Sequence, residues 1–169
     1  MSAPLPSRRQ LTKAALAATL LGPLACLIRP ANAEDDPLLT IGHPGGTTEL
    51  PRSVIETMAL RTISTATPWT EGISAFEGPL LRDVLARAGI GASSGTTIVA
   101  RALNDYVVDM PLADAFDHDV IVATRENGLH MPLRKRGPFF ILYPLNDPAL
   151  WNERYFSRCA WQLRSLDVS

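Results

Sequence analysis

The stretch from Asn127 to Pro144 constrains the fold more than any other part of this 169-residue chain. It begins with Asn127-Gly128, which is typical of a hairpin turn because a type I′ turn needs positive φ at both central residues. It ends with the apolar run Phe139–Tyr143, which Pro144 terminates. A continuous apolar run bounded by a turn signal indicates a strand that is covered on both faces. The sequence therefore predicts a buried core strand here.

Three cations separate this hairpin turn from the core strand. Arg134, Lys135 and Arg136 precede Gly137-Pro138, where one residue lacks a side chain and the next has a fixed φ. Cations held against such a corner suggest a site for an anionic or acceptor-rich ligand. The same residues are equally compatible with a solvated basic loop, so this stretch alone leaves both interpretations open.

The first 33 residues have the pattern of an export leader. Residues 1–13 carry three cations and no acid, residues 14–28 are almost wholly apolar, and Ala31-Asn32-Ala33 offers small residues for cleavage. This pattern predicts a signal peptide over residues 1–33, since the apolar run is too short for a membrane span. Residues 7–13 also resemble the twin-arginine export motif. We therefore expect a periplasmic protein, with lipid attachment at Cys26 as the weaker alternative.

Removal of this leader changes both the charge and the cysteine count. It contains four of the 16 Lys and Arg residues and none of the 17 Asp and Glu residues, which leaves residues 34–169 with a formal charge of about −5. Such a charge argues against a nucleic-acid partner. Only Cys159 remains, so an intramolecular disulfide, a CxxC redox site and a cysteine-rich zinc site are all excluded. The length of this part corresponds to one domain.

Short strands with a few short helices, in non-alternating order, predict the fold class. The pattern favours a single α+β domain with a mixed, largely antiparallel sheet. One helix is expected to begin at Gly78-Pro79, with Pro79 in its first turn, and to stop at Gly89. Further short helices are expected at 51–58 and 112–116. Strands are expected at 38–42, 60–65, 97–102, 107–110, 120–124, 139–143 and 161–168.

The common catalytic and metal-binding motifs do not occur in the chain. His43, His118 and His130 have no metal-ligand spacing, so no metal site is expected from them. There is no GxSxG elbow and no GxGxxG loop. The aspartates between positions 105 and 119 are dense enough for a catalytic pair, but their spacing does not show that any two converge.

The remaining polar and aromatic groups suit a flat heteroaromatic ligand. Asp105 can accept two N–H bonds from an amidine-like edge, and Asn104 offers an amide. The other candidates are the faces of Trp69 and Tyr106 and the donors of Arg134 and Arg136. The alternatives are that Asn104-Asp105 only forms a turn and that Trp69 fills the core.

Several segments resemble the molybdopterin-binding domain of the sulfite-oxidase-like oxidoreductases. These segments are residues 76–85, Asp119–Ala123, Asn127-Gly128 and Gly137-Pro138. The resemblance implies the sulfite-oxidase-like molybdopterin-binding fold and a molybdopterin-type cofactor. The family holds molybdenum through a cysteine after an early strand, whereas residues 62–69 contain none. Its His-Gly-x-Pro-x-Arg motif is also altered here, so we expect a pterin without a metal.

The altered motifs in turn resemble those of the small periplasmic pterin-binding proteins of Proteobacteria. The matching segments are residues 102–106, 134–138, 143–145 and 161–163. This resemblance implies a non-catalytic protein that binds a free pterin and acts with a membrane-bound partner that makes or degrades cyclic-di-GMP. The alternative is a molybdopterin-dependent oxidoreductase or a subunit of one. The candidate pocket residues are then Trp69, Asn104, Asp105, Tyr106, Arg134, Arg136 and Gly137.

Overall fold

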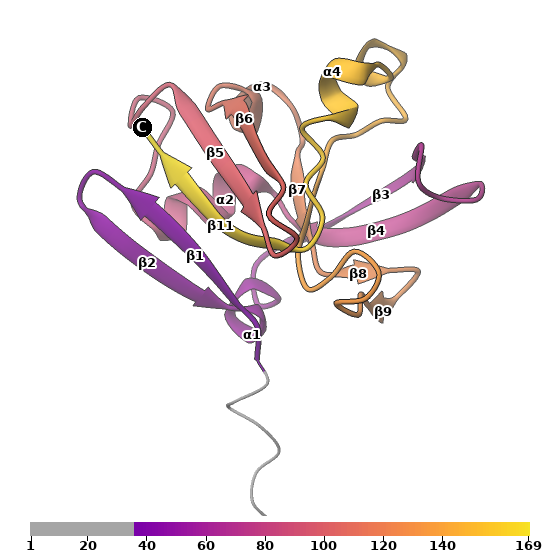
Figure 1. The fold of residues 1–169 in the computed structure, drawn as a ribbon, viewed down its shortest axis with the longest axis horizontal. Coiled ribbons are helices and arrows are strands. Elements are labelled where there is room, and N and C mark those ends of the chain that lie inside the picture. The colour runs from indigo at the N-terminus through magenta and orange to yellow at the C-terminus, as the bar shows by residue number, and fades with distance from the viewer. Residues whose placement is uncertain (1–35) are drawn as a thin grey trace, which may run out of the picture. The chain divides into compact units, whose positions relative to one another are not determined.

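The computed structural model describes residues 36–169, which fold as an α+β domain (Figure 1). The predicted signal peptide and the alternative lipid attachment at Cys26 lie outside the described residues. A five-stranded sheet forms one part of the fold, in the order β2-β1-β11-β5-β6. Its strands are β1 (Leu38–His43), β2 (Gly46–Pro51), β5 (Thr97–Ala102), β6 (Val107–Pro111) and β11 (Leu163–Val168).

This sheet is mixed, as the sequence predicted. β1 runs parallel to β11, and the other neighbouring strands are antiparallel. The last strand of the chain therefore lies between β1 and β5, in the middle of the sheet (Figure 1). This position brings the residues just before β11 next to the connection between β5 and β6, because Leu103 N–H donates to the Gln162 carbonyl at 2.9 Å.

A second sheet and a buried strand pair complete the β structure. The second sheet is antiparallel, in the order β3-β4-β8-β9, with β3 (Leu60–Ala66), β4 (Ile73–Pro79), β8 (Arg125–Glu126) and β9 (Leu129–His130). The pair is β7 (Ile121–Ala123) with β10 (Phe140–Leu142). Every residue from Phe139 to Tyr143 is buried, which confirms the predicted core strand. Asn127 and Gly128 both have positive φ in the β8–β9 turn, again as predicted.

Short helices connect these strands. They are α1 (Arg52–Ile55), α2 (Leu81–Arg87), α3 (Asp114–Asp117), the 3-10 turn η1 (Pro148–Leu150) and α4 (Glu153–Phe156). α2 buries Leu81, Val84 and Leu85 against the core, and Gly89 stops it with a φ of 76°. None of the helices within residues 36–169 is long and apolar enough to cross a membrane.

The predicted start of this longest helix was wrong. Pro79 is the last residue of β4, Leu80 is still extended, and α2 begins at Leu81. β4 pairs with β3 along its whole length, and a Cβ at Gly78 would overlap the Val122 carbonyl of β7. A glycine inside a strand often marks such a close backbone approach. Gly78-Pro79 therefore allows β4 to pack closely against β7, although the dipeptide is equally typical of a helix start.

Candidate functional site

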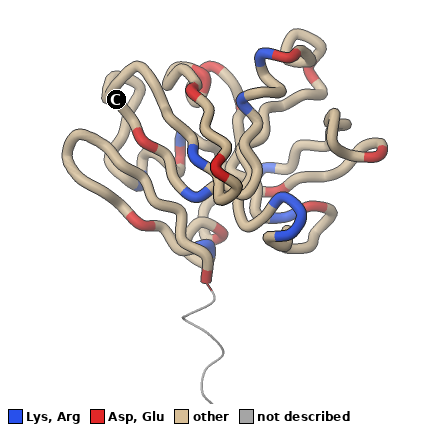
Figure 2. Tube along the Cα trace, in the orientation of Figure 1, with Lys and Arg blue, Asp and Glu red and all other residues tan. Residues whose placement is uncertain are grey.

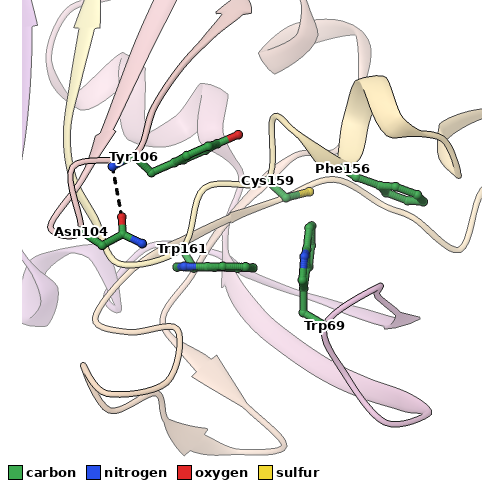
Figure 3. Close-up of a pocket in the computed structure, with 6 residues that line it drawn as sticks. All are labelled: Trp69, Asn104, Tyr106, Phe156, Cys159 and Trp161. Carbon is green, nitrogen blue, oxygen red and sulfur yellow. Dashed lines mark hydrogen bonds between the residues drawn. The ribbon is translucent and has the colours of Figure 1, made fainter.

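An aromatic pocket of about 190 Å³ opens where three separate parts of the chain meet (Figure 3). The β3–β4 loop contributes one ring, the β5–β6 connection contributes two side chains, and the segment from the end of α4 to the start of β11 contributes the rest. The lining residues are Trp69, Asn104, Tyr106, Phe156, Cys159 and Trp161. None of these lining residues, all within the described part of the chain, carries a charged side chain.

The aromatic rings hold one another in place. Trp69 meets Trp161 edge to face, with ring centroids 5.0 Å apart and an interplanar angle of 87°. Trp69 also contacts Phe156, and its ring centroid lies 6.4 Å from that of the core residue Phe140. In Figure 3, Tyr106 and Trp161 lie one above the other, with Trp69 upright beside them. Edge-to-face contacts of this kind are favourable, so the walls of the pocket are preformed.

Two hydrogen bonds fix the polar rim of the pocket. Asn104 Oδ1 accepts from Tyr106 N–H at 3.2 Å, which leaves the Asn104 amino group available as a donor (Figure 3). The Tyr106 hydroxyl donates to the Ser157 carbonyl at 2.6 Å. The second bond ties the β5–β6 connection to the segment after α4. A ligand entering this pocket therefore meets aromatic faces and the neutral amide donor of Asn104.

Cys159 lies in the wall of the pocket and is almost fully buried. Its burial raises the pKa of the thiol to about 12, so Cys159 is protonated at neutral pH. Cysteines that bind metals do so as thiolates, which positive or hydrogen-bonding surroundings favour. At Cys159 burial dominates, and a hydrogen bond with the Tyr143 backbone only partly offsets it.

A buried polar network positions the segment that carries Phe156 and Cys159. Asp114 of α3 accepts a hydrogen bond from the Tyr143 hydroxyl at 2.7 Å and forms an ion pair with Arg158, also at 2.7 Å. Burial of Tyr143 and its bond to Asp114 raise the pKa of that hydroxyl. Removal of one partner from a buried pair leaves a charge uncompensated, so this network holds the pocket wall to the core.

A second cavity, the cationic groove, lies between the β8–β9 hairpin and loop 131–136 and has a volume of about 450 Å³. Arg134 and Lys135 are exposed there. Arg136 instead binds Glu126 at 2.6 Å, with both side chains largely buried. Its other amino group donates to the Trp69 carbonyl at 3.4 Å. Arg136 therefore joins the groove to the loop that carries Trp69.

The structure divides the predicted site residues between these two cavities. Trp69, Asn104 and Tyr106 gather at the aromatic pocket, whereas Arg134 and Arg136 line the cationic groove. Asp105 and Gly137 line neither cavity. Asp105 is exposed in the β5–β6 turn with a φ of 63°. Gly137 is buried, and a Cβ there would overlap the Met131 carbonyl, so its role is close packing of the loop.

Three lining residues were not among the candidates. Trp161 belongs to residues 161–163, one of the segments that resemble the small pterin-binding proteins, and its aromatic side chain could have marked it as a pocket residue. No sequence pattern marked Phe156 or Cys159 as a pocket residue, because only the folding of the chain around α4 brings them to the pocket. Free cysteines are usually small buried hydrophobic residues, and Cys159 is buried as well, in the pocket wall.

The residues present fit a pterin ring better than a metal held by thiolate. In the cysteine-free loop after β3, hydroxyl groups close the turn: Thr67 N–H donates to Thr70 Oγ1 at 3.0 Å, and Trp69 N–H donates to Thr67 Oγ1 at 3.2 Å. Within residues 36–169, no group of three His, Cys, Asp or Glu side chains is arranged to hold a metal ion. The aromatic pocket, by contrast, offers ring faces and an amide donor to a flat heterocycle.

Comparisons with known proteins agree on one kind of domain. Residues 52–145 match the family described as the oxidoreductase molybdopterin binding domain. The fold is similar to that of the sulfane dehydrogenase SoxCD from Paracoccus pantotrophus, with a TM-score of 0.59 and 16% sequence identity. That similarity covers 78% of this chain and 38% of the SoxCD chain, so this chain spans well under half of its structural relative. No curated protein matches the sequence.

Proposed function

The chain belongs to the oxidoreductase molybdopterin-binding domain family, and from this premise we propose that it binds a free pterin in the aromatic pocket. It is a sulfite-oxidase-like molybdopterin-binding domain by sequence and by fold. The observation that carries the proposal is the pocket itself, which the rings of Trp69, Tyr106 and Trp161 line together with the uncharged amide of Asn104.

The size and chemistry of the pocket suit a bicyclic ring. Pockets for drug-sized ligands have volumes of about 300–1,000 Å³, and this one is smaller, at about 190 Å³. A pterin is flat and carries a carbonyl and ring nitrogens that can accept from the Asn104 amino group. Stacking on Trp161 and Tyr106 would supply most of the affinity, since base–aromatic stacking contributes roughly 1–3 kcal/mol per ring in comparable sites.

We propose further that this pterin binding is non-catalytic and serves signalling. The protein would act in the periplasm with a membrane-bound partner that makes or degrades cyclic-di-GMP. The export leader pattern supports the location, and the resemblance of residues 102–106, 134–138 and 161–163 to small pterin-binding proteins supports the role.

A molybdopterin-dependent oxidoreductase, or a subunit of one, is the second candidate. The family match favours it, because the family is named for oxidoreductases. The twin-arginine-like leader also favours it, since that route exports proteins that are already folded, often around a cofactor. In that case the aromatic pocket would hold the pterin part of the cofactor, and Cys159 would be the one thiol among its lining residues in the described part of the chain.

Calorimetric titration of the full chain with an oxidised and a reduced pterin tests the proposal. We expect one site per chain, and at a pterin concentration of 100 times Kd a stabilisation of about 2.7 kcal/mol. Trp161→Leu should weaken binding by roughly fivefold to 150-fold through lost stacking. Asn104→Ala, a change at an exposed position, should weaken it several-fold with the fold intact. Leu60→Ala is the control, because Leu60 is a partly exposed apolar residue of β3 that does not line the pocket.

The outcome also separates the two candidates. Absence of pterin binding by the wild-type chain would remove the sensor role. Elemental analysis of protein exported from a host that makes the molybdenum cofactor provides the second measurement. Close to one molybdenum atom per chain would favour the oxidoreductase, whereas pterin without molybdenum supports the proposal.

A further inference from the structure

The cationic groove presents apolar and positively charged side chains together on one exposed segment. Leu129, which lines the groove, is 74% exposed, and Leu133, which lies beside the groove between the lining residues Pro132 and Arg134, is 54% exposed. Arg134 and Lys135 follow at once and are also exposed. Figure 2 shows the resulting stretch of positive charge in the loop beside the β8–β9 hairpin. We propose that this groove docks an acidic segment of a partner protein that carries apolar side chains between its carboxylates.

The charges of the groove are not balanced within the domain. Glu126 is the one acid that lines it, and Arg136 neutralises this carboxylate at 2.6 Å. His130, also in the lining, lies 2.9 Å from Glu56, which in turn binds Arg125. Arg134 and Lys135 have no ion-pair partner among residues 36–169. Two free cations thus stand on a domain whose overall charge is negative, and they complement an acidic partner.

The apolar part of the groove distinguishes a protein partner from a membrane surface. Attachment to anionic lipids by charge takes clusters of about 4–8 Lys and Arg residues, whereas this segment offers two. A net negative domain would also be repelled by such a surface. Exposed leucines beside charged side chains correspond to the apolar centre and polar rim of a protein interface. Leu129 and Leu133 would be covered by the partner's apolar side chains.

The groove is joined to the aromatic pocket through Gln162. The Gln162 side chain donates to the Leu133 carbonyl at 2.6 Å, and its backbone N–H donates to the Arg136 carbonyl at 2.9 Å. Trp161, the preceding residue, lines the pocket. A partner on Leu133–Lys135 therefore contacts a segment that is bonded directly to the pocket wall. The inference rests on the proposed function only where it identifies the partner as the membrane-bound signalling protein. That partner would sense whether the pocket is filled.

Nuclear magnetic resonance of the isotope-labelled full chain, without pterin, tests the docking. The probe is a blocked peptide in which glutamate and leucine alternate, compared with a lysine–leucine and a glutamate–serine peptide of the same length. We expect saturable shifts of the backbone amides between Leu129 and Arg136 with the glutamate–leucine peptide. The lysine–leucine peptide should cause none, and the glutamate–serine peptide should bind at least fivefold more weakly.

Charge reversal identifies the contacts. The double variant Arg134→Glu/Lys135→Glu should weaken the peptide at least tenfold. The matched double variant Arg87→Glu/Arg164→Glu, at two exposed cations outside the groove, should bind as the wild type does. Equal losses in both double variants, or shifts centred elsewhere, would overturn the proposal.

Two further probes address other occupants of the groove. Inorganic phosphate that reproduced the amide shifts would assign the groove to a small anion and overturn the proposal. Phosphatidylserine vesicles that bound the wild type but not the Arg134→Glu/Lys135→Glu variant would assign it to a membrane, with the same consequence. Because no pterin is present, failure of docking would leave pterin binding in the aromatic pocket untouched.

Discussion

At the scale of single residues, position 105 holds an aspartate in the left-handed region, with a φ of 63°. L-residues are disfavoured there by roughly 1–2 kcal/mol, although aspartate tolerates it better than most. Glycine adopts positive φ about as readily as negative φ. We expect Asp105→Gly to raise the free energy of unfolding by up to about 1 kcal/mol, and pterin affinity to change less than twofold. Denaturant unfolding and calorimetry provide the two measurements.

Calorimetry tests the contact between Asp105 and the ligand that the sequence suggested. If Asp105 accepts two N–H bonds from the pterin, its loss should weaken binding by a factor of about thirty or more, the effect of losing a charged partner. The exposed position of Asp105 outside both cavities leads us to expect no such loss. A thirtyfold loss in Asp105→Gly would return this carboxylate to the binding site.

Gln162 also has a positive φ, 53°, and it joins three loops. It donates to the carbonyls of Leu133 and Arg136 and accepts from Leu103 N–H. Gln162→Ala removes the side-chain bond, worth about 0.5–1.5 kcal/mol. Because Trp161 is its neighbour, we expect both the stability and the pterin affinity to fall, the affinity by roughly twofold to twelvefold.

Gln162→Glu is the matched variant, because it keeps the side-chain length but places a carboxylate against the Leu133 carbonyl. It should weaken pterin binding at least as much as Gln162→Ala. Fluorescence titration of both variants provides the measurement. Wild-type affinity in both would show that Gln162 supports the fold without positioning the pocket.

At the scale of elements, Glu56 pins the β8–β9 hairpin to the end of α1. Burial would raise the pKa of Glu56, but hydrogen bonds from Arg125 and His130 outweigh this and lower the pKa from 4.5 to about 2. Such a carboxylate contributes stability that is present above pH 4.5 and lost as the pH falls toward 2. We expect Glu56→Gln to reduce the free energy of unfolding at pH 7 by about 1.5–3 kcal/mol.

The pH dependence distinguishes this ion pairing from simple packing. The difference in stability between the wild type and Glu56→Gln should shrink between pH 4.5 and pH 2, because the wild-type carboxyl becomes protonated there. Urea unfolding at several pH values measures it. A difference that stayed constant down to pH 2 would mean that the carboxylate charge does not contribute.

At the scale of the whole molecule, the chain is expected to be shortened during export. The prediction is that the exported protein begins at Glu34, after Ala31-Asn32-Ala33. These residues lie outside the described part of the chain, so the prediction rests on the sequence. Mass spectrometry of protein from the periplasmic fraction measures the N-terminus. A lipid-modified Cys26 as the first residue would contradict it and place the domain on a membrane.

The sequence by itself determined the features that depend on neighbouring residues. Asn127-Gly128 forms its turn because both residues tolerate positive φ, and Phe139–Tyr143 is buried because a wholly apolar run must be covered on both faces. Gly89 ends its helix for the same local reason. The α+β class followed from the order of such segments. Each of these results needs information from only a few consecutive residues.

Only the tertiary structure decided which side chains meet. The insertion of β11 between β1 and β5 brings Trp161 beside Asn104 and Tyr106, and strand order cannot be read from local patterns. Pairing with β3 and contact with β7 placed Gly78-Pro79 in a strand, because tertiary packing outweighed a local helix signal. The three cations of the loop are alike in the sequence. In the structure Arg136 pairs with Glu126, 10 residues away in the chain, and is largely buried, whereas Arg134 and Lys135 are exposed and have no ion-pair partner among residues 36–169.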